Sequence, residues 1–240
     1  MQKKNVWLIV ACVVIAVAFI AIGVFLFLTK DLEGREVSIE GTWYLVSHNS
    51  DPTNDASVPQ YLENQYLVFK DGKINYYVNG ESKLTGDYVY ADSKIKISNM
   101  QTEIDQFPSE LRTEIVASSD DFIKLIDDAK IRDWKMIRCA ANDTQVAPVS
   151  DELLAGKWNV LVHGNSASGG ETLEFDTAAK ILHAHISSGD VDITYTRDTD
   201  NQLNVDKGFG RVLLLPVAEN KIALVQLDDH CYVWILEKAK

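Results

Sequence analysis

Apolar residues follow two different patterns along the chain. Residues 6–28 form an unbroken run of 23 residues with no charged, amide or hydroxyl side chain. A helix of this length is about 35 Å long, and the hydrocarbon core of a bilayer is roughly 30 Å thick. The run therefore predicts a transmembrane helix over residues 6–28, with the lipid bilayer as its partner.

The charges that flank this run predict its orientation. Lys3 and Lys4 precede the run, and the flank that follows it carries mixed charges. Because basic residues concentrate on the cytoplasmic side, we expect a single-pass signal-anchor protein of the cell membrane with a cytoplasmic N-terminus and extracytoplasmic C-terminal domains. Two alternatives are less favoured. A cleaved signal peptide has a shorter apolar region, and a lipobox-like stretch ending at Cys12 is followed by sixteen further apolar residues.

After residue 36 the pattern changes to short runs of alternating apolar and polar residues. Residues 66–69, 74–78 and 193–195 are rich in aromatic and β-branched side chains, and clusters of turn-forming residues separate such runs. A period of two predicts a mainly β fold, with antiparallel strands in a sandwich or barrel. We expect two short helices in addition, at residues 108–111 and at residues 150–154.

The chain also contains an internal repeat. Residues 41–48 and 156–163 both open with Gly-x-Trp, at an offset of 115, and in each copy a His follows the Trp by five residues. Near the ends of the copies, residues 134–137 match residues 232–235. Each copy has about a hundred residues, a normal domain size. The predicted organisation is a cytoplasmic stub and transmembrane helix (1–35), a first β domain (36–140), a linker (141–150) and a second β domain (151–240).

The start of each copy resembles a known group of β-barrels. Residues 41–44 resemble the first strand of avidins, and residues 41–46 resemble that of fatty-acid-binding proteins. Together with the hairpin signal at residues 71–72 and a meander of short strands, they resemble the lipocalin/calycin group. The resemblance implies two tandem antiparallel barrels. It does not extend to a ligand, since the Arg-x-Tyr carboxylate grip of fatty-acid-binding proteins and the avidin biotin site are both missing.

The resemblance also implies a role for two tryptophans. In such folds a Trp of the first strand plugs the closed end of the barrel, and a basic side chain of the last strand covers it. Trp43 and Trp158 would take this place. Arg138 is the candidate for the covering side chain in the first copy, and Lys238 is the candidate in the second.

Charge and cysteine content limit which binding partners, disulfides and cofactors are expected. From residue 30 onward the chain has 21 basic and 35 acidic side chains, a net charge of −14. This excess of acid argues against binding to nucleic acid. Cys139 and Cys231 are the only cysteines after the apolar run, which leaves open either a disulfide between them or two buried free thiols. No C-x-x-C motif is present, and no metal or other cofactor is predicted.

Aromatic and histidine side chains are the candidates for a binding site. His48 and His163 occupy equivalent positions in the two copies, while His183 and His185 alternate with apolar residues and are expected to face solvent. No catalytic residue is predicted, because no signature such as Gly-x-Ser-x-Gly supports any of the polar side chains. The predicted ligand-lining residues are Trp43, His48, Tyr76, Tyr88, Tyr90, Trp158, His163 and Tyr195.

These observations lead to one preferred function and two alternatives. The preferred function is a membrane-anchored, extracytoplasmic, non-catalytic binding protein for a small apolar or amphipathic ligand. The first alternative is a structural or protein-interaction module of the cell envelope, whose barrels are solid and whose partner is another envelope protein. An enzyme is the least favoured of the three.

Overall fold

The computed structural model describes residues 37–49, 60–62, 64–104, 107–129, 132–142, 145–227 and 231–240. Ser38–Lys240 form one compact unit, which holds the described strands and one short helix. The transmembrane helix predicted over residues 6–28 lies outside the described residues. Among those that are described, no helix combines the length and the apolar character needed to span a bilayer. The predicted fold class and single-pass location are therefore corrected: tandem barrels are supported, and the membrane anchor is not.

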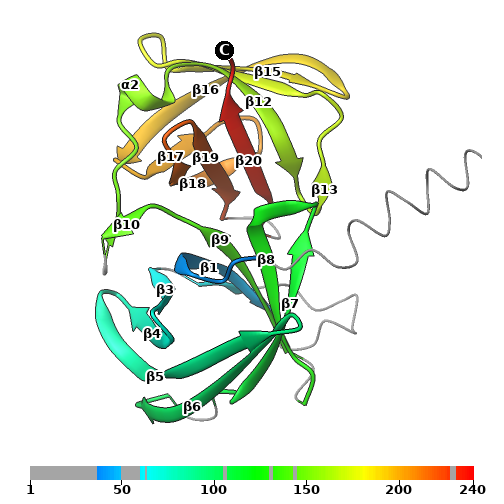
Figure 1. Ribbon diagram of the computed structural model, residues 1–240. Coiled ribbons are helices and arrows are strands. Elements are labelled where there is room, and N and C mark those ends of the chain that lie inside the picture. Colours follow the sequence, from blue (N-terminus) through cyan, green and yellow to red (C-terminus); the bar gives the residue numbers. More distant parts are fainter. Residues whose placement is uncertain are drawn as a thin grey trace, which may run out of the picture. The chain divides into compact units, whose positions relative to one another are not determined.

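The first copy folds into a closed barrel of eight antiparallel strands (Figure 1). Each strand pairs with the next one along the chain, and β1 closes the barrel by pairing with β9; β2 (Gln60–Tyr61) adds a short pairing to β1. Closure leaves no unpaired sheet edge between these strands. The strands are β1 (Gly41–Asn49), β3 (Gln65–Lys70), β4 (Lys73–Val78), β5 (Glu81–Ala91), β6 (Lys94–Thr102), β7 (Glu110–Val116), β8 (Ser119–Asp127) and β9 (Arg132–Arg138).

The second copy forms a second closed barrel of eight strands with the same order of pairing. Here β12 closes the barrel by pairing with β20, and β13 (Ser166–Ala167) takes the place that β2 has in the first barrel. The predicted tandem barrels are thus confirmed. The strands are β12 (Gly156–His163), β14 (Thr172–Asp176), β15 (Ile181–Ile186), β16 (Gly189–Thr199), β17 (Gln202–Val205), β18 (Gly210–Ala218), β19 (Lys221–Gln226) and β20 (Val233–Lys238).

The register of the closing strands demonstrates the internal repeat. Trp43 lies opposite Arg138, and Trp158 lies opposite Lys238. A β-bulge follows two residues after each Trp. This register makes Trp134 equivalent to Trp234, so the sequence alignment that matched residues 134–137 with 232–235 is wrong by two positions.

Short elements connect the two barrels. A small hairpin of β10 (Ala141–Asn142) and β11 (Gln145–Val146) is followed by α2 (Asp151–Leu154). Ser150 caps α2 by accepting a hydrogen bond from the backbone N–H of Leu153, so the helical turn predicted at residues 150–154 is confirmed. The helix predicted at residues 108–111 is wrong, because β7 begins within that segment and pairs with β6 and β8.

Each barrel is plugged at one end by its tryptophan. Both indoles are fully buried, and each donates a hydrogen bond of 2.8 Å from Nε1 to a carbonyl four residues earlier. The guanidinium of Arg138 lies 4.4 Å from the centre of the Trp43 ring, and Nζ of Lys238 lies 4.5 Å from that of Trp158. Both covering cations that the resemblance implied are therefore in place.

A shared apolar cluster joins the outer surfaces of the two barrels. Tyr44, Val46 and Ile137 of the first barrel belong to the same buried cluster as Ala223 and Ile235 of the second. Hydrogen bonds also cross between the barrels, among them the bond of 2.7 Å from the N–H of residue 140 to the carbonyl of residue 216. The copies are thus packed together over an apolar surface.

Cys139 and Cys231 both belong to this shared cluster. They are buried free thiols, so the disulfide that the sequence left open is not formed. Burial raises the pKa of Cys139 to about 12, and it also raises the pKa of Cys231. Both side chains therefore act as small apolar residues in the cluster.

Candidate functional site

The first barrel holds a cavity of about 110 Å³ that is partly open to solvent. The cavity lies beyond Trp43, toward the end of the barrel that this residue does not plug, and most of its wall is apolar. Strands β1, β3, β4, β7, β8 and β9 all contribute side chains, because the residues that point inward alternate along each strand. The lining residues are Leu45, Leu67, Tyr76, Ile104, Phe107, Pro108, Leu111, Leu125, Arg132 and Trp134.

Arg132 is the only charged residue that lines this cavity among the described residues. Its Nη2 donates a hydrogen bond of 2.6 Å to the carboxylate of Asp127, whose side chain is almost fully buried. Its Nε is also buried but has no hydrogen-bond partner among the described residues. A buried donor without a partner is unfavourable by about 1–3 kcal/mol.

Trp134 forms the wall next to Arg132, and the imidazole of His48 stacks on its indole as a second polar group. The guanidinium of Arg132 lies 5.4 Å from the indole centre, and the ring of His48 stacks on the same indole at 5.1 Å. Nε2 of His48 is buried without a partner among the described residues. Burial, together with the positive charge of Arg132, lowers the pKa of His48, so this imidazole is neutral near pH 7.

Tyr76 supplies the remaining polar atom of the wall. Its hydroxyl donates a hydrogen bond to Gln65, and its ring lies 5.9 Å from that of Phe107. Burial raises the pKa of Tyr76 to about 12. Tyr76, which the sequence suggested as a ligand-lining residue, is therefore a neutral hydrogen-bonding group in the cavity wall.

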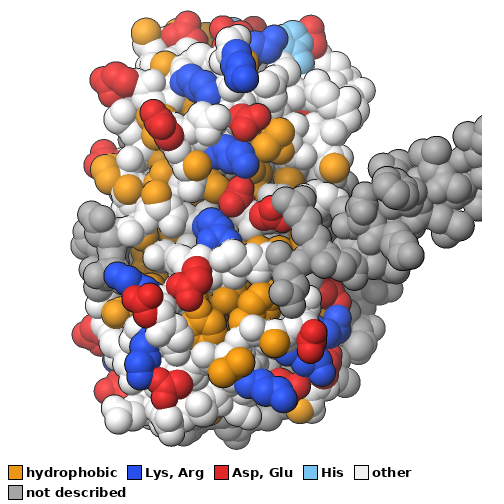
Figure 2. All heavy atoms as spheres, viewed as in Figure 1, with side chains coloured by type: hydrophobic (Ala, Val, Ile, Leu, Met, Phe, Trp, Pro, Cys, Tyr) orange, Lys and Arg blue, Asp and Glu red, His pale blue; other side chains and the backbone are white. Residues whose placement is uncertain are grey.

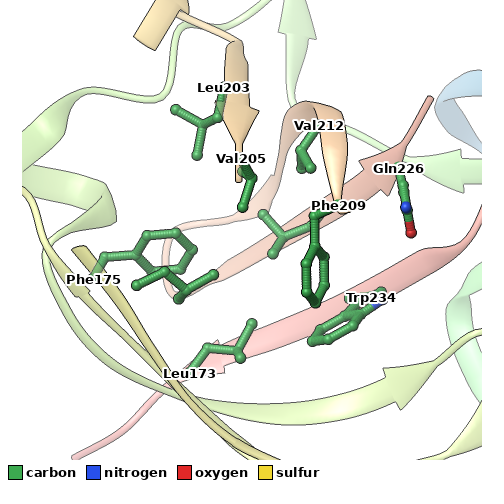
Figure 3. A pocket seen from close by; sticks show the side chains of 10 residues that line it. Leu173, Phe175, Leu203, Val205, Phe209, Val212, Gln226 and Trp234 are labelled. Carbon is green, nitrogen blue, oxygen red and sulfur yellow. The ribbon is translucent and has the colours of Figure 1, made fainter. Parts of the chain in front are cut away.

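The second barrel is filled by its own side chains. Its interior cavity measures only about 20 Å³, which is room for about one water molecule. Figure 3 shows Phe209 lying beside Trp234 at the wall of this space, which Leu173 and Phe175 also line; the rings of Phe209 and Trp234 are 5.9 Å apart. The two copies thus share one fold but differ in the volume that they leave open.

A polar hollow lies outside this filled interior, around the end of β12. It is lined by His163, Glu171, His185 and the loop between β12 and β14, and its volume is about 720 Å³. Nδ1 of His163 lies 3.1 Å from the carboxylate of Glu171, and the His163 ring lies 4.5 Å from that of Trp234. The His–Trp contact therefore recurs in both barrels, and within the described part of the chain His163 has a carboxylate as its partner.

The other residues proposed from the sequence lie away from the cavity of the first barrel. Trp43 and Trp158 plug the closed ends. The hydroxyl of Tyr88 bonds to Glu40, and that of Tyr90 lies 3.1 Å from Oγ1 of Thr113.

Tyr195 belongs to the core of the second barrel, and burial raises its pKa to about 12. Of the eight predicted ligand-lining residues, the structure places Tyr76 in the cavity wall and His48 against Trp134. These two are the predicted residues that we retain for the site.

His183 and His185 face solvent, as expected from the alternation on their strand. Nδ1 of His183 lies 2.7 Å from the carboxylate of Asp192, and His185 contacts Asp190. The residues that the structure describes contain no group of three or more His, Cys, Asp or Glu side chains arranged to hold a metal ion.

Sequence reasoning missed Arg132, Trp134 and Phe107. A signal was present for the first two, because they are two positions apart on a strand and must therefore share a face. This signal was concealed because the alignment of the two copies matched Trp134 with Tyr232 instead of Trp234. Phe107 gave no signal, because it lies in a connection between strands.

The molecular surface mixes charges of both signs. Figure 2 shows acidic and basic side chains interspersed over the visible face, with hydrophobic side chains exposed among them. Exposed ion pairs occur on the surface of the molecule, for example Lys73 with Asp87 and Lys94 with Glu110. This face therefore carries no continuous charged patch that would mark a second site.

Comparison with known proteins gives distant structural similarity. No protein-family model and no curated protein matches the sequence. Among solved structures, the chain is similar to a protein of unknown function from the DUF3598 family of Nostoc punctiforme. The sequence identity is 10%, the match covers 84% of this chain and 96% of that chain, and the TM-score is 0.27. A similarity at this level supports no functional inference, so the function rests on the geometry of the cavity.

Proposed function

We propose that this protein is a non-catalytic binding protein whose first barrel holds a small apolar or amphipathic ligand. The observation that carries the proposal is the difference between the copies: the first barrel leaves about 110 Å³ open, and the second leaves about 20 Å³. Protein interiors are normally close-packed. We attribute the larger cavity of the first barrel to an occupant, since the second barrel, which has the same fold, packs its interior more tightly.

The volume limits what the cavity can enclose. An engineered apolar cavity of about 150 Å³ binds benzene or xenon, so this one accommodates a short alkyl chain or a single small ring. A longer molecule would leave its remaining part outside the enclosed space. The small enclosed area also limits affinity, since ligands of this size gain at most about 1.5 kcal/mol per non-hydrogen atom.

The second barrel supports a different role. Its interior is packed, and its outer surface contributes Leu215, Ala223 and Ile235 to the cluster shared with the first barrel. We propose that it is a structural module that stabilises the binding barrel by covering its apolar outer face. This role corresponds to the structural-module alternative with a solid barrel, but it applies to the second copy alone.

The test is to fill the cavity and measure binding of a neutral apolar probe. 1-Hexanol added to the wild-type protein is expected to shift the indole NMR resonance of Trp134 in a saturable manner. In Leu111→Phe the added ring occupies the cavity, and we expect the affinity to fall at least tenfold. Val89→Phe is the matched control, because Val89 is 68% exposed and lies outside the cavity. Equal binding by Leu111→Phe and the wild-type protein would rule out the cavity as the site.

A further inference from the structure

We propose that the polar hollow around the end of β12 binds a neutral saccharide, whose ring packs against Tyr232 and whose hydroxyl groups bond to the surrounding loop. This site lies outside the filled interior of the second barrel, and it is separate from the cavity of the first barrel. Its volume of about 720 Å³ falls within the range of about 300–1,000 Å³ that is typical of small-molecule sites.

The first observation is an accessible aromatic ring in the wall of the hollow. Tyr232 lines the hollow and is 45% exposed. A Cβ added at Gly164 would lie 3.3 Å from Cδ1 of Tyr232, so the ring packs directly against the backbone there. The N–H of Gly164 donates a hydrogen bond of 2.8 Å to the carbonyl of Val233, which fixes this backbone. The ring is thus supported by ordered structure and remains accessible to a ligand.

The second observation is that uncharged hydrogen-bonding groups line the same hollow. Asn165, Ser166 and Ser187 are exposed and contribute to its wall. Oδ1 of Asn165 accepts a hydrogen bond of 3.0 Å from Nζ of Lys135, which leaves the amide NH₂ of Asn165 as a donor. The serine hydroxyls both donate and accept. The wall therefore suits a ligand whose polar groups also do both.

A largely buried carboxylate holds this wall in place. The Glu171 side chain is 11% exposed, and its Oε2 lies 3.1 Å from Nδ1 of His163 and accepts a hydrogen bond of 3.3 Å from Oγ of Ser168. Because Nδ1 of His163 is occupied and this side chain is 40% exposed, its Nε2 is the nitrogen that remains for a ligand. The wall is therefore formed before a ligand arrives, which reduces the cost of binding.

The charges around the hollow favour a neutral ligand. Among the described residues, no Lys or Arg lines it, and the whole chain has a net charge of −12, so an anion would be repelled. A cation gains little, because Glu171 is largely buried and already bonded to His163 and Ser168. A wholly apolar ligand would cover the polar groups of the wall without bonding to them, which is unfavourable.

A saccharide has both kinds of group that this wall requires. The C–H groups on one face of a pyranose ring form an apolar surface that can pack on the ring of Tyr232. Its hydroxyl groups both donate and accept hydrogen bonds, as do the serine side chains opposite them. The combination of an exposed aromatic ring with uncharged hydroxyl and amide groups therefore identifies a neutral saccharide as the class of ligand.

The experiment measures binding of five neutral disaccharides to the full-length protein: maltose, cellobiose, lactose, mannobiose and N,N′-diacetylchitobiose. At millimolar concentrations we expect at least one of them to give saturation-transfer NMR signals and to shift the ring resonances of Tyr232 in a saturable manner. A derivative of that disaccharide in which one CH₂OH group is replaced by a carboxylate should bind at least tenfold more weakly, because no basic side chain of the described residues lines the hollow.

Variants then locate the site. Tyr232→Ala removes the ring and should lower the affinity at least tenfold, whereas Tyr232→Phe keeps the ring and should bind nearly as well as the wild-type protein. Val191→Ala is the matched control, because Val191 is 36% exposed on β16 of the same barrel and does not line the hollow. Leu111→Phe, which fills the cavity of the first barrel, should leave disaccharide binding unchanged.

The outcomes are distinct from those of the hexanol test. If none of the five disaccharides binds, the inference is overturned, and the proposed function of the first barrel is unaffected. If binding persists in Tyr232→Ala, the saccharide lies elsewhere, and the inference is overturned as well. Tighter binding of the carboxylate derivative than of its neutral parent would overturn the assignment of a neutral ligand.

Discussion

Individual histidines in this molecule are set to different charge states by their surroundings. His48 is packed against Trp134 near Arg132, and its pKa is lowered by burial and by that charge. His183 is exposed beside Asp192, and its hydrogen bond to this carboxylate raises its pKa. The two residues should therefore contribute to the pH dependence of stability with opposite signs.

The pH dependence can be measured by comparing wild type with His48→Gln. Since His48 has a lower pKa in the folded than in the unfolded state, the unfolded chain binds more protons below about pH 6.5. The contribution of His48 to stability is present above pH 6.5 and is lost as the pH falls toward the folded pKa. We expect His48→Gln to flatten this loss in urea unfolding curves recorded between pH 5 and pH 8.

His183→Gln is a control for which the opposite pH dependence of stability is expected. Its folded pKa is raised above 6.5, so its contribution is present below pH 6.5 and is lost as the pH rises through the folded pKa. Removing this residue should lower the urea midpoint at pH 6 relative to pH 8. The same direction of change in both variants would contradict the assigned shifts.

The short helix α2 between the barrels helps to position Trp158 in the first strand of the second barrel. Ser150 caps α2 through the N–H of Leu153 at 3.2 Å. The carbonyl of Leu154, at the end of α2, accepts the hydrogen bond from the buried indole of Trp158. The cap therefore supports both the helix and the plug of the second barrel.

Ser150→Ala is expected to reduce the free energy of unfolding by about 1 kcal/mol, because a helix loses its capping oxygen. Urea denaturation followed by fluorescence measures the change. Ser150→Asp restores an acceptor at the same place and should recover most of the loss. A destabilisation that Asp does not recover would assign the effect to something other than the cap.

Much of the element structure was predictable from the sequence because it follows from local rules. The alternation of apolar residues predicted the strands, and Gly-x-Trp marked both first strands. The covering cations, Arg138 and Lys238, were implied by the resemblance to the lipocalin/calycin group. The segment at residues 108–111 was not predictable, since Leu111 and Thr113 are buried on alternate positions of β7 only after the barrel closes. Local propensity does not contain that information.

The candidate site was less predictable than the strands. Tyr76 was found because it is an aromatic residue on a strongly alternating strand. The empty volume beside it depends on Phe107, and the filled volume in the second barrel depends on Phe209; both lie in connections between strands. Whether such a side chain fills a barrel is decided by tertiary packing, which a strand pattern does not report.

At the scale of the whole molecule, the shared cluster couples the two barrels. Cys139 lies in it on the side of the first barrel and Cys231 on the side of the second. Their burial and raised pKa values predict that neither thiol reacts with 5,5′-dithiobis(2-nitrobenzoate) in the native protein at pH 8.

As urea is added, we expect both thiols to become reactive at the same midpoint, because unfolding either barrel exposes the common cluster. The measurement requires a Cys12→Ser background and peptide mass spectrometry to distinguish the two sites. Leu215→Ala, a change in the second barrel, should lower both midpoints together, since core truncations of this kind cost about 2–5 kcal/mol. Two separate midpoints would show that the barrels unfold independently.

The shared cluster also has a consequence for self-association, because the two copies contribute different faces to it. Ala223 of the second barrel is in the cluster, and its equivalent in the first barrel is Lys124; Ile137 of the first barrel is in the cluster, and its equivalent in the second is Glu237. A contact between non-equivalent faces is heterologous, and identical units joined in this way form rings or, where the rotation does not close, open-ended filaments. Lys124 and Glu237 place charges on the two leftover faces, and burying them in a further contact of this kind is unfavourable, so the cluster joins one pair of barrels.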